Sequence, residues 1–240
     1  MSNSNWSELS AALVDELHLA TPPLAITFSD APPEGVDAFD REMPSPLDDG
    51  RTGRVAAGCV FWIEAAERTF STVAADHGNC SVGSLTHGFK TLDEVAGNGD
   101  VAALLETGWV TMDVVPQIPV VTEKPGAVTY GPLADTPVDP DVVFLRVNGR
   151  QLMVLSDAIP GLRIEGKPQC HIVAVAKEER VPAASVGCAL SRVRTGMQPT
   201  EMTCALPADQ LADIVASVQR NATADSAVAK YAADDARRFA

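Results

Sequence analysis

The sequence predicts an α/β fold, with a mixed α+β arrangement as the alternative, in one compact unit of 240 residues. Short apolar segments typical of buried strands alternate with segments whose apolar residues follow helical spacing. The segment DVVFLRV at residues 141–147 is apolar along most of its length and rich in valine, which indicates a strand buried on both faces. A chain of this length is also long enough to bury a substantial core.

The first half of the chain begins with a helix and continues into a short strand. Residues 7–18 carry leucine and alanine at helical spacing behind Ser7, which is a favourable N-cap residue. Residues 22–28 predict a strand introduced by prolines, and residues 30–54 are rich in proline, glycine and aspartate and predict a long loop. The other elements expected here are a buried helix at 56–67, a strand at 70–75 and helical pieces at 91–96 and 100–108.

The second half begins near residue 127 with a strand candidate, which the buried strand at 141–147 follows. A helix at 149–159 is expected to stop before Pro160. Pro207 is expected to open a helix, because a proline at the first helical position gives up no hydrogen bond. A C-terminal helical tail is expected at 221–240. The remaining segments are an apolar cysteine segment at 170–179, PAASVG at 182–187, a second cysteine segment at 188–196 and a strand at 201–206.

Two parts of the chain, residues 20–110 and 125–220, repeat the same order of features. In each part a strand-like segment precedes a cysteine in an apolar segment, and a second cysteine follows in a loop. A glycine lies eight residues after each second cysteine. We therefore expect two pseudo-repeated halves related by a pseudo-two-fold axis, which would bring the thiols together and create a pocket between the halves. The cysteines at these places are Cys59, Cys80, Cys170 and Cys188.

Composition excludes several classes of partner. The net charge of −14 and the lack of any lysine and arginine cluster argue against nucleic acid, and the acidity fits a solubility role. No apolar run approaches the roughly 18 residues of a membrane span. The polar N-terminus shows no signal peptide, so a cytoplasmic location is the default expectation. The odd number of cysteines, five without a CxxC pair, argues against a disulfide framework. Oligomeric state is not predicted.

The first hypothesis for the thiols is a bound metal or iron–sulfur cluster serving redox or small-molecule chemistry. Thiolates hold both iron–sulfur clusters and zinc, and imidazoles can replace some of them. His77 and His171 are therefore substitute ligands. The spacing of the cysteines matches no ferredoxin or zinc-finger pattern, so the ligands would come from distant segments. The candidate metal ligands are Cys59, Cys80, Cys170 and Cys188.

Two alternatives remain open. In a metal-free thiol enzyme, Cys80 would be the nucleophile, His77 its base and Asp76 the group that orients the imidazole. Their closeness in one loop counts against this arrangement, because catalytic triads usually assemble from distant segments. In the other alternative the thiols only pack, as buried free cysteines often do, and the protein is a non-catalytic module that binds a small ligand.

Several single residues carry further expectations. The glycine-rich, polar neighbours of His77 favour an exposed side chain, whereas Trp62 is expected in the core. Arg192 and Arg194 are placed to stabilise a thiolate or to bind an anionic ligand or cofactor. Gly131 would allow close approach of the backbone to such a ligand. No GxGxxG, P-loop, HExxH or GxSxG motif is present, so nucleotide-binding and serine-hydrolase functions have no support.

Short blocks between about Leu24 and Val218 carry a family resemblance. They are GCVFW, DHGNCSVG, YGPLADTPVDPDVV, QLMVL, CHIVAVA, VGCALSR and EMTCALP. Together they resemble the uncharacterised family catalogued as domain of unknown function 169, most specifically in GPL followed by a proline-rich turn and the PDVV strand. The resemblance implies a compact α/β domain with cysteines at recurring places and a redox or metal role. It implies no catalytic residue, and Cys204 lies where a variable residue is expected.

Overall fold

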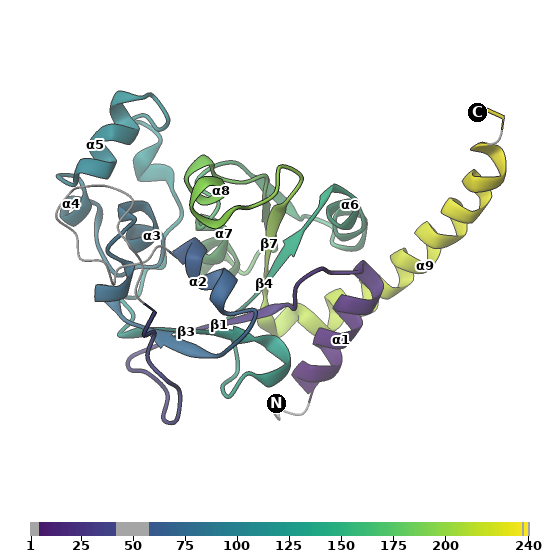
Figure 1. Cartoon of the computed structure of the whole chain (residues 1–240), viewed down its shortest axis with the longest axis horizontal. Coiled ribbons are helices and arrows are strands. Elements are labelled where there is room, and N and C mark those ends of the chain that lie inside the picture. The colour runs from purple at the N-terminus through teal and green to yellow at the C-terminus, as the bar shows by residue number, and fades with distance from the viewer. Residues whose placement is uncertain (1–4, 42–57, 237, 240) are drawn as a thin grey trace.

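The computed structural model describes residues 5–41, 58–236 and 238–239, and these residues form a mixed α/β fold around one sheet (Figure 1). Seven strands in these residues pair in the order β2-β3-β1-β4-β7-β6-β5. Every neighbouring pair is antiparallel except β5 and β6, which are parallel. The strands are β1 (Leu24–Ser29), β2 (Phe70–Thr72), β3 (Ala127–Pro132), β4 (Val142–Val147), β5 (Arg163–Glu165), β6 (Ala183–Ser185) and β7 (Met202–Pro207).

Helices cover both faces of the sheet, so the core has two layers. Successive strand residues point to opposite faces. In β4, Val143 and Leu145 pack with α1, α6 and α9, whereas Phe144 packs with α2 and α7. The helices are α1 (Trp6–Leu17), α2 (Gly58–Glu64), α3 (Ser81–Thr86), α4 (Leu92–Val95), α5 (Gly99–Glu106), α6 (Gly149–Ala158), α7 (His171–Ala174), α8 (Ala189–Thr195) and α9 (Leu211–Ala236).

Most predicted elements form, with shifted ends. The strand expected at 141–147 is β4, the central strand of the sheet, and it is buried along nearly its whole length. Of the loop expected at 30–54, residues 42–54 lie outside the described residues, and so do the first two residues of the helix expected at 56–67. No helix in the described part of the chain is long and apolar enough to cross a membrane.

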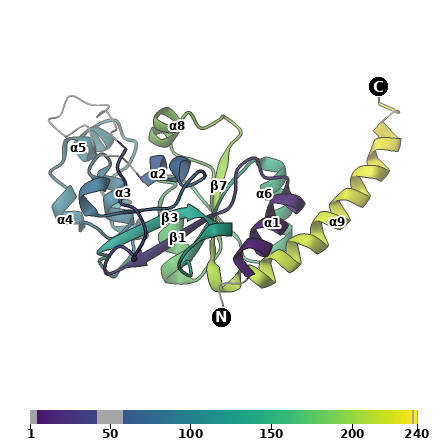
Figure 2. The same cartoon turned by 60° about the horizontal axis from the view of Figure 1, so that its bottom comes forward.

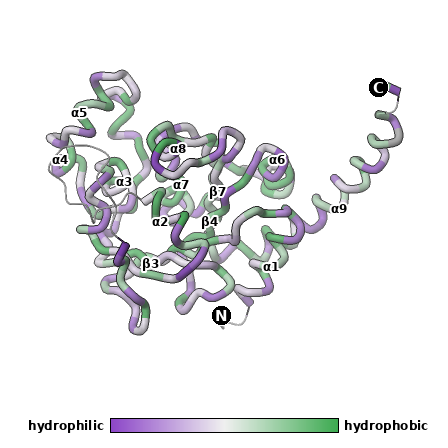
Figure 3. Tube along the Cα trace, in the orientation of Figure 1, coloured by the Kyte–Doolittle hydropathy of each residue, from purple (hydrophilic) through white to green (hydrophobic). Residues whose placement is uncertain are grey.

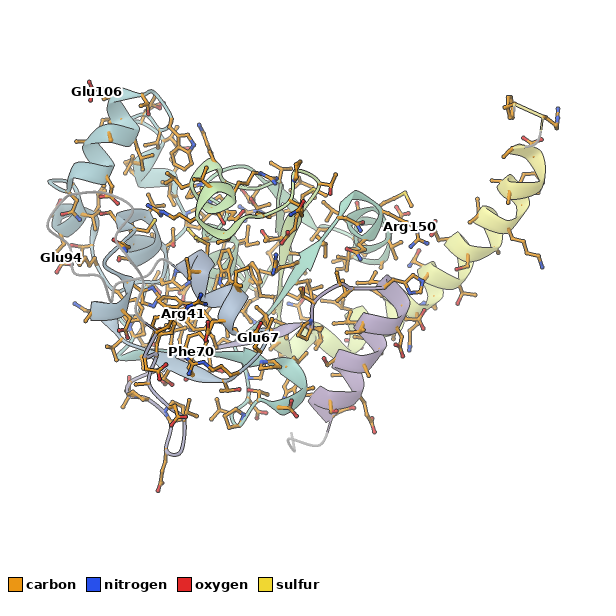
Figure 4. All side chains as sticks on the ribbon, in the orientation of Figure 1. Arg41, Glu67, Phe70, Glu94, Glu106 and Arg150 are labelled. Atoms are coloured by element: carbon orange, nitrogen blue, oxygen red, sulfur yellow. The ribbon has the colours of Figure 1, made fainter. Side chains whose placement is uncertain are left out.

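The C-terminal helix differs from the expected pair of helices. A 3-10 turn at Ala208–Gln210 leads into α9, which continues to Ala236, so the expected boundary at residue 221 falls inside one helix. Figures 1 and 2 show α9 passing α1 and then projecting away from the sheet. Hydrophilic and weakly hydrophobic residues alternate along the projecting part (Figure 3). Arg150 of α6, labelled in Figure 4, pairs with Asp225 of α9 at 2.9 Å.

The sheet has the same strand order on each side of the β1–β4 pair. From this pair outward, β3 and β2 follow on one side and β7 and β6 on the other, all antiparallel. Both β3 and β7 end in a proline and continue into a 3-10 turn, at Leu133–Asp135 and Ala208–Gln210. Two related halves would each place their strands in the same order, as β1-β3-β2 and β4-β7-β6 do here. The duplication itself stays a prediction.

Candidate four-cysteine site

Four cysteines from distant parts of the chain line one cavity of about 30 Å³. A buried water needs roughly 10–15 Å³ on this measure, so the cavity has room for about two or three. The wall also includes Trp109, Gln169 and Arg194. Contacts between α2 and α8 and between α3 and α7 bring the two halves together around the cavity. The four cysteines are the predicted set, Cys59, Cys80, Cys170 and Cys188.

Cys80 and Cys188 occupy equivalent places in two similar loops. Each has an extended backbone and is the N-cap residue of a short helix, α3 or α8. The Cys80 sulfur accepts a hydrogen bond from the backbone N–H of Gly83 at 3.4 Å. After each helix the chain reaches a glycine with positive φ, 77° at Gly88 and 62° at Gly196. The shared spacing from cysteine to glycine therefore corresponds to one short helix and the left-handed residue that ends it.

Cys59 and Cys170 lie near the first turns of α2 and α7, and each receives a hydroxyl group from the other half of the chain. The Ser191 hydroxyl of α8 interacts with the Cys59 side chain, and the Thr86 hydroxyl of α3, which donates to the Gly83 carbonyl at 3.2 Å, interacts with that of Cys170. A hydroxyl donor favours the thiolate form of a cysteine.

The thiols lie close enough to influence one another electrostatically. Burial raises the pKa of Cys59 to about 12, and the neighbouring Cys80 adds to the effect. Burial and Cys80 also raise the pKa of Cys170 well above its usual range. Burial is again the main cause of the raised pKa of Cys188. At neutral pH these three thiols are protonated, and their negative form needs a positive partner.

Arg194 of α8 supplies a positive charge at the cavity. Burial opposes this charge, yet hydrogen bonding to Cys80 and attraction to Cys80 and Cys59 leave the pKa of the guanidinium raised. Its Nη1 atom is buried and has no hydrogen-bond partner among the residues that the structure describes. The cavity therefore combines four sulfur atoms with an arginine that retains hydrogen-bonding capacity.

His77 is buried, and the expectation that it is exposed was wrong. Its side chain is 1% exposed, and its ring centroid lies 4.7 Å from that of Phe61 and 4.5 Å from that of Phe89. The polar neighbours of His77 in the sequence do not indicate these aromatic contacts, because Phe61 and Phe89 lie more than ten residues away along the chain. Burial lowers the pKa of His77 well below its ordinary value, and His87 adds to this effect.

The two residues proposed to activate Cys80 have local partners. His77 Nε2 lies 2.9 Å from Thr72 Oγ1, and because that hydroxyl donates to the Val128 carbonyl, the imidazole donates to it. The carboxylate of Asp76 accepts the backbone N–H of Val73 at 2.8 Å. The residues that line the cavity include Cys80 but not His77. The Cys80–His77–Asp76 arrangement stays a prediction.

Arg192 and Gly131 have structural partners. The Arg192 guanidinium donates to three main-chain carbonyls, and these hold the loop that follows α8. At Gly131, an added Cβ would lie 2.2 Å from Thr69 Oγ1, so the close approach is to this side chain. A role for either residue in binding a cofactor stays a prediction. The carbonyls bound by Arg192 belong to Val186, Gln198 and Glu201.

His171 and Cys204 lie outside the cavity wall. His171 Nε2 is 3.3 Å from a carboxylate oxygen of Glu165, and burial lowers the pKa of this histidine. Cys204 is fully buried in β7 and packs in the core beneath α9. Burial raises its pKa to about 12. Cys204 is therefore a packing residue and a natural reference for the other four thiols.

Two polar residues at the cavity, Gln169 and Ser191, were missed in the sequence analysis. Gln169 precedes Cys170 and Ser191 follows Cys188 by three residues, and this closeness to the cysteines was the available signal. In the described residues, no group of three or more histidine, cysteine, aspartate or glutamate side chains is arranged to hold one metal ion.

The fold and the cavity define a mixed α/β protein with a four-cysteine site between its halves. The chain belongs to the DUF169 family, described as uncharacterised ArCR proteins, whose sequence profile matches residues 12–217. The predicted family is therefore confirmed. The comparison found no match among curated proteins and none among solved structures.

Proposed function

We propose that the four cysteines of the cavity bind an iron–sulfur cluster or another thiolate-bound metal cofactor, which the protein uses for redox or small-molecule chemistry. One observation carries the proposal: four thiols from two distant parts of the chain line a single cavity. The fifth cysteine, Cys204, packs in the core elsewhere. Buried cysteines that only pack have no need to line the same cavity.

The charges around the cavity support thiolate ligation. Metal binding requires each thiol to lose its proton. Burial and the neighbouring sulfurs raise the pKa of Cys59 and Cys170, so the thiolate forms of these residues need a positive charge nearby. A bound cation provides the positive charge that such thiolates lack. Arg194, Ser191 and Thr86 add one guanidinium and two hydroxyl groups that favour the charged sulfurs.

An iron–sulfur cluster suits this arrangement better than a single ion. A cluster is held by about four thiolates, each bound to one iron, so it does not require three thiolates around the same atom. Thiolate ligands are also those that such clusters prefer. When bound, the cluster would supply one-electron transfer. The chain would hold it through the four sulfurs and balance part of its negative charge with Arg194.

The test is anaerobic purification and reconstitution with iron and sulfide, followed by visible absorption and analysis of bound iron and sulfide. Wild type should show the broad thiolate-to-iron absorption. Replacing Cys59, Cys80, Cys170 or Cys188 by alanine should remove most of the bound metal. Cys204→Ala is the matched control, because it removes a buried thiol outside the cavity, and it should bind metal as wild type does. A folded wild-type protein that stays colourless and metal-free would overturn the proposal.

A second candidate is a metal-free thiol enzyme with Cys80 as nucleophile. The contacts that favour it are the hydrogen bonds to the Cys80 sulfur from Arg194 and from the backbone N–H of Gly83. In that case Cys80 should react with iodoacetamide at least about tenfold faster than the other thiols at neutral pH. Arg194→Gln should remove most of this difference. Equal, slow alkylation of Cys80 and Cys204 would exclude the candidate.

A further inference from the structure

A second, smaller cavity adjoins the first, and Cys59 is part of the wall of both. The volume of the second cavity is about 10 Å³, close to the roughly 10–15 Å³ that one water molecule needs. It shares Cys59, Gln169 and Ser191 with the wall of the first cavity. The Arg146–Glu201 ion pair also contributes to its wall, and these two side chains are 20% and 15% exposed. The second cavity therefore reaches the surface beside this ion pair.

Three residues of this wall each carry a buried polar atom that has no hydrogen-bond partner within the described parts of the chain. The atoms are the indole Nε1 of Trp62, the hydroxyl of Thr203 and the amide Oε1 of Gln169. These residues are between 1% and 2% exposed and come from α2, β7 and the segment before α7. Leaving three such groups unpaired would be costly. Together they offer a donor, an acceptor and a group that can act as either.

The known hydrogen bonds fix the direction of the Gln169 amide. Gln169 Nε2 donates to the Ser191 hydroxyl oxygen at 2.8 Å. The single proton of that hydroxyl is therefore free to point at the Cys59 side chain, with which Ser191 interacts. The amide nitrogen therefore faces Ser191, and the oxygen of the same group is left for another donor.

We propose that the second cavity binds one water molecule, which accepts a hydrogen bond from Trp62 and donates to Gln169 and Thr203. Buried waters make about three hydrogen bonds, the number that these residues provide. The water completes a directed chain from the Trp62 indole through water, Gln169 and Ser191 to the Cys59 sulfur. Each donor in the chain points toward the sulfur, so their dipoles reinforce one another.

Trp62 and Gln169 thereby act as positioning residues for Cys59. In this role they act on the Cys59 sulfur only through the Ser191 hydroxyl, whose direction they fix. Outer hydrogen bonds of this kind orient metal ligands and tune the bound group. This consequence rests on the proposed metal site, whereas the water site does not.

The water site is tested on metal-free protein by NMR with ¹⁵N-labelled tryptophan. The indole N–H of Trp62 should show a cross-peak to water with the sign that marks a long-lived bound molecule. Trp62→Phe assigns the signal by removing it. Trp6 is the internal comparison, because its indole donates to Asp139 at 2.9 Å in an exposed position. A folded protein without the Trp62 cross-peak would overturn the proposal.

Two variants of Thr203 and one of Gln169 separate bound water from relay through a hydroxyl proton. Thr203→Val removes that proton, yet the cross-peak should persist because Trp62 and Gln169 still hold the water. Thr203→Ser keeps the hydroxyl and should resemble wild type. Gln169→Met removes the acceptor and should lower the cross-peak by more than about half, since one of three partners is lost together with the chain to Ser191. Loss of the signal in Thr203→Val alone would contradict a bound water.

The positioning role is tested by the reduction potential of the reconstituted protein. Trp62→Phe and Gln169→Met should both lower the potential, because hydrogen bonds to the sulfurs are among the factors that set it. Trp6→Phe, which changes a tryptophan outside the walls of both cavities, should leave it unchanged. An unchanged potential in all three variants would overturn the positioning role. Failure to bind any cluster would overturn the proposed function and leave the NMR result standing.

Discussion

The two thiol loops share a backbone design but have different buried groups behind them. Each consists of an N-cap cysteine, a short helix and a glycine with positive φ, around Cys80 in one half and Cys188 in the other. Behind the first loop lie two fully buried histidines, His77 and His87, whose ring centroids are 5.6 Å apart. The second loop instead carries polar groups that reach the thiols.

This difference separates packing from electrostatics. Burial lowers the pKa of His87 to about 4 and that of His77 well below its ordinary value, so both rings are neutral at pH 7. The second loop supplies the positive charge of Arg194 and the hydroxyl of Ser191. The first half therefore holds its loop by packing, whereas the second half sets the charge of the shared cavity.

The largest expected effect concerns the glycines that end the two short helices. An alanine Cβ at Gly88 would lie 2.7 Å from the Val121 carbonyl, whereas at Gly196 it would meet nothing within 4 Å. Gly88→Ala should therefore lower the free energy of unfolding by about 3 kcal/mol, and Gly196→Ala by about 1 kcal/mol from the left-handed backbone alone. Urea unfolding measures both. Equal losses of unfolding free energy in the two variants would show that the contact with the Val121 carbonyl does not distinguish the two loops.

The buried histidines predict a stability loss in acid, to which His87 of the first half contributes. The folded pKa of His87, about 4, lies below the ordinary value of 6.5, so its stabilising contribution is complete above about pH 6.5 and is lost as the pH falls toward 4. The loss from this group should reach about 3 kcal/mol. His87→Gln should flatten the pH dependence of urea unfolding over this range.

The matched control for this prediction is the exposed histidine of the chain, His18. His18→Asn suits its positive φ of 53° and controls for the replacement of a histidine that is not buried. A wild-type stability that does not change between pH 7 and pH 4 would contradict the burial of neutral histidines behind the Cys80 loop.

A smaller, crossed effect is expected for the two arginines of α8. Arg192→Gln leaves three backbone carbonyls without their donor and should lower the free energy of unfolding by about 1–2 kcal/mol. Arg194→Gln should change stability less, but it should lower the reduction potential of a bound cluster by removing positive charge beside Cys80. Urea unfolding and redox titration of both variants give the comparison. A larger stability loss in Arg194→Gln, together with a lower reduction potential in Arg192→Gln, would contradict these roles.

Local patterns predicted the elements well, and long-range contacts account for what the sequence missed. The apolar run at 141–147 predicted the central strand, and the repeated order of cysteines and glycines predicted which thiols belong together. The burial of His77 was missed because its aromatic neighbours, such as Phe61, are distant in sequence. The chain from Trp62 through Gln169 was missed for the same reason, since its members come from separate elements.

The most direct test of the central claim is whether the four cavity cysteines are protected together by one bound group. Anaerobically reconstituted protein, before and after removal of metal by a chelator, is treated with excess iodoacetamide, and each cysteine peptide is quantified by mass spectrometry. All four thiols of the cavity should be protected when the protein is loaded. After chelation they should react slowly, because burial raises the pKa of three of them, but faster than Cys204, which lies outside the cavity wall. Cys204, buried in β7, should stay unreactive in both states. Alkylation of the four that is the same with and without added metal would contradict a shared site.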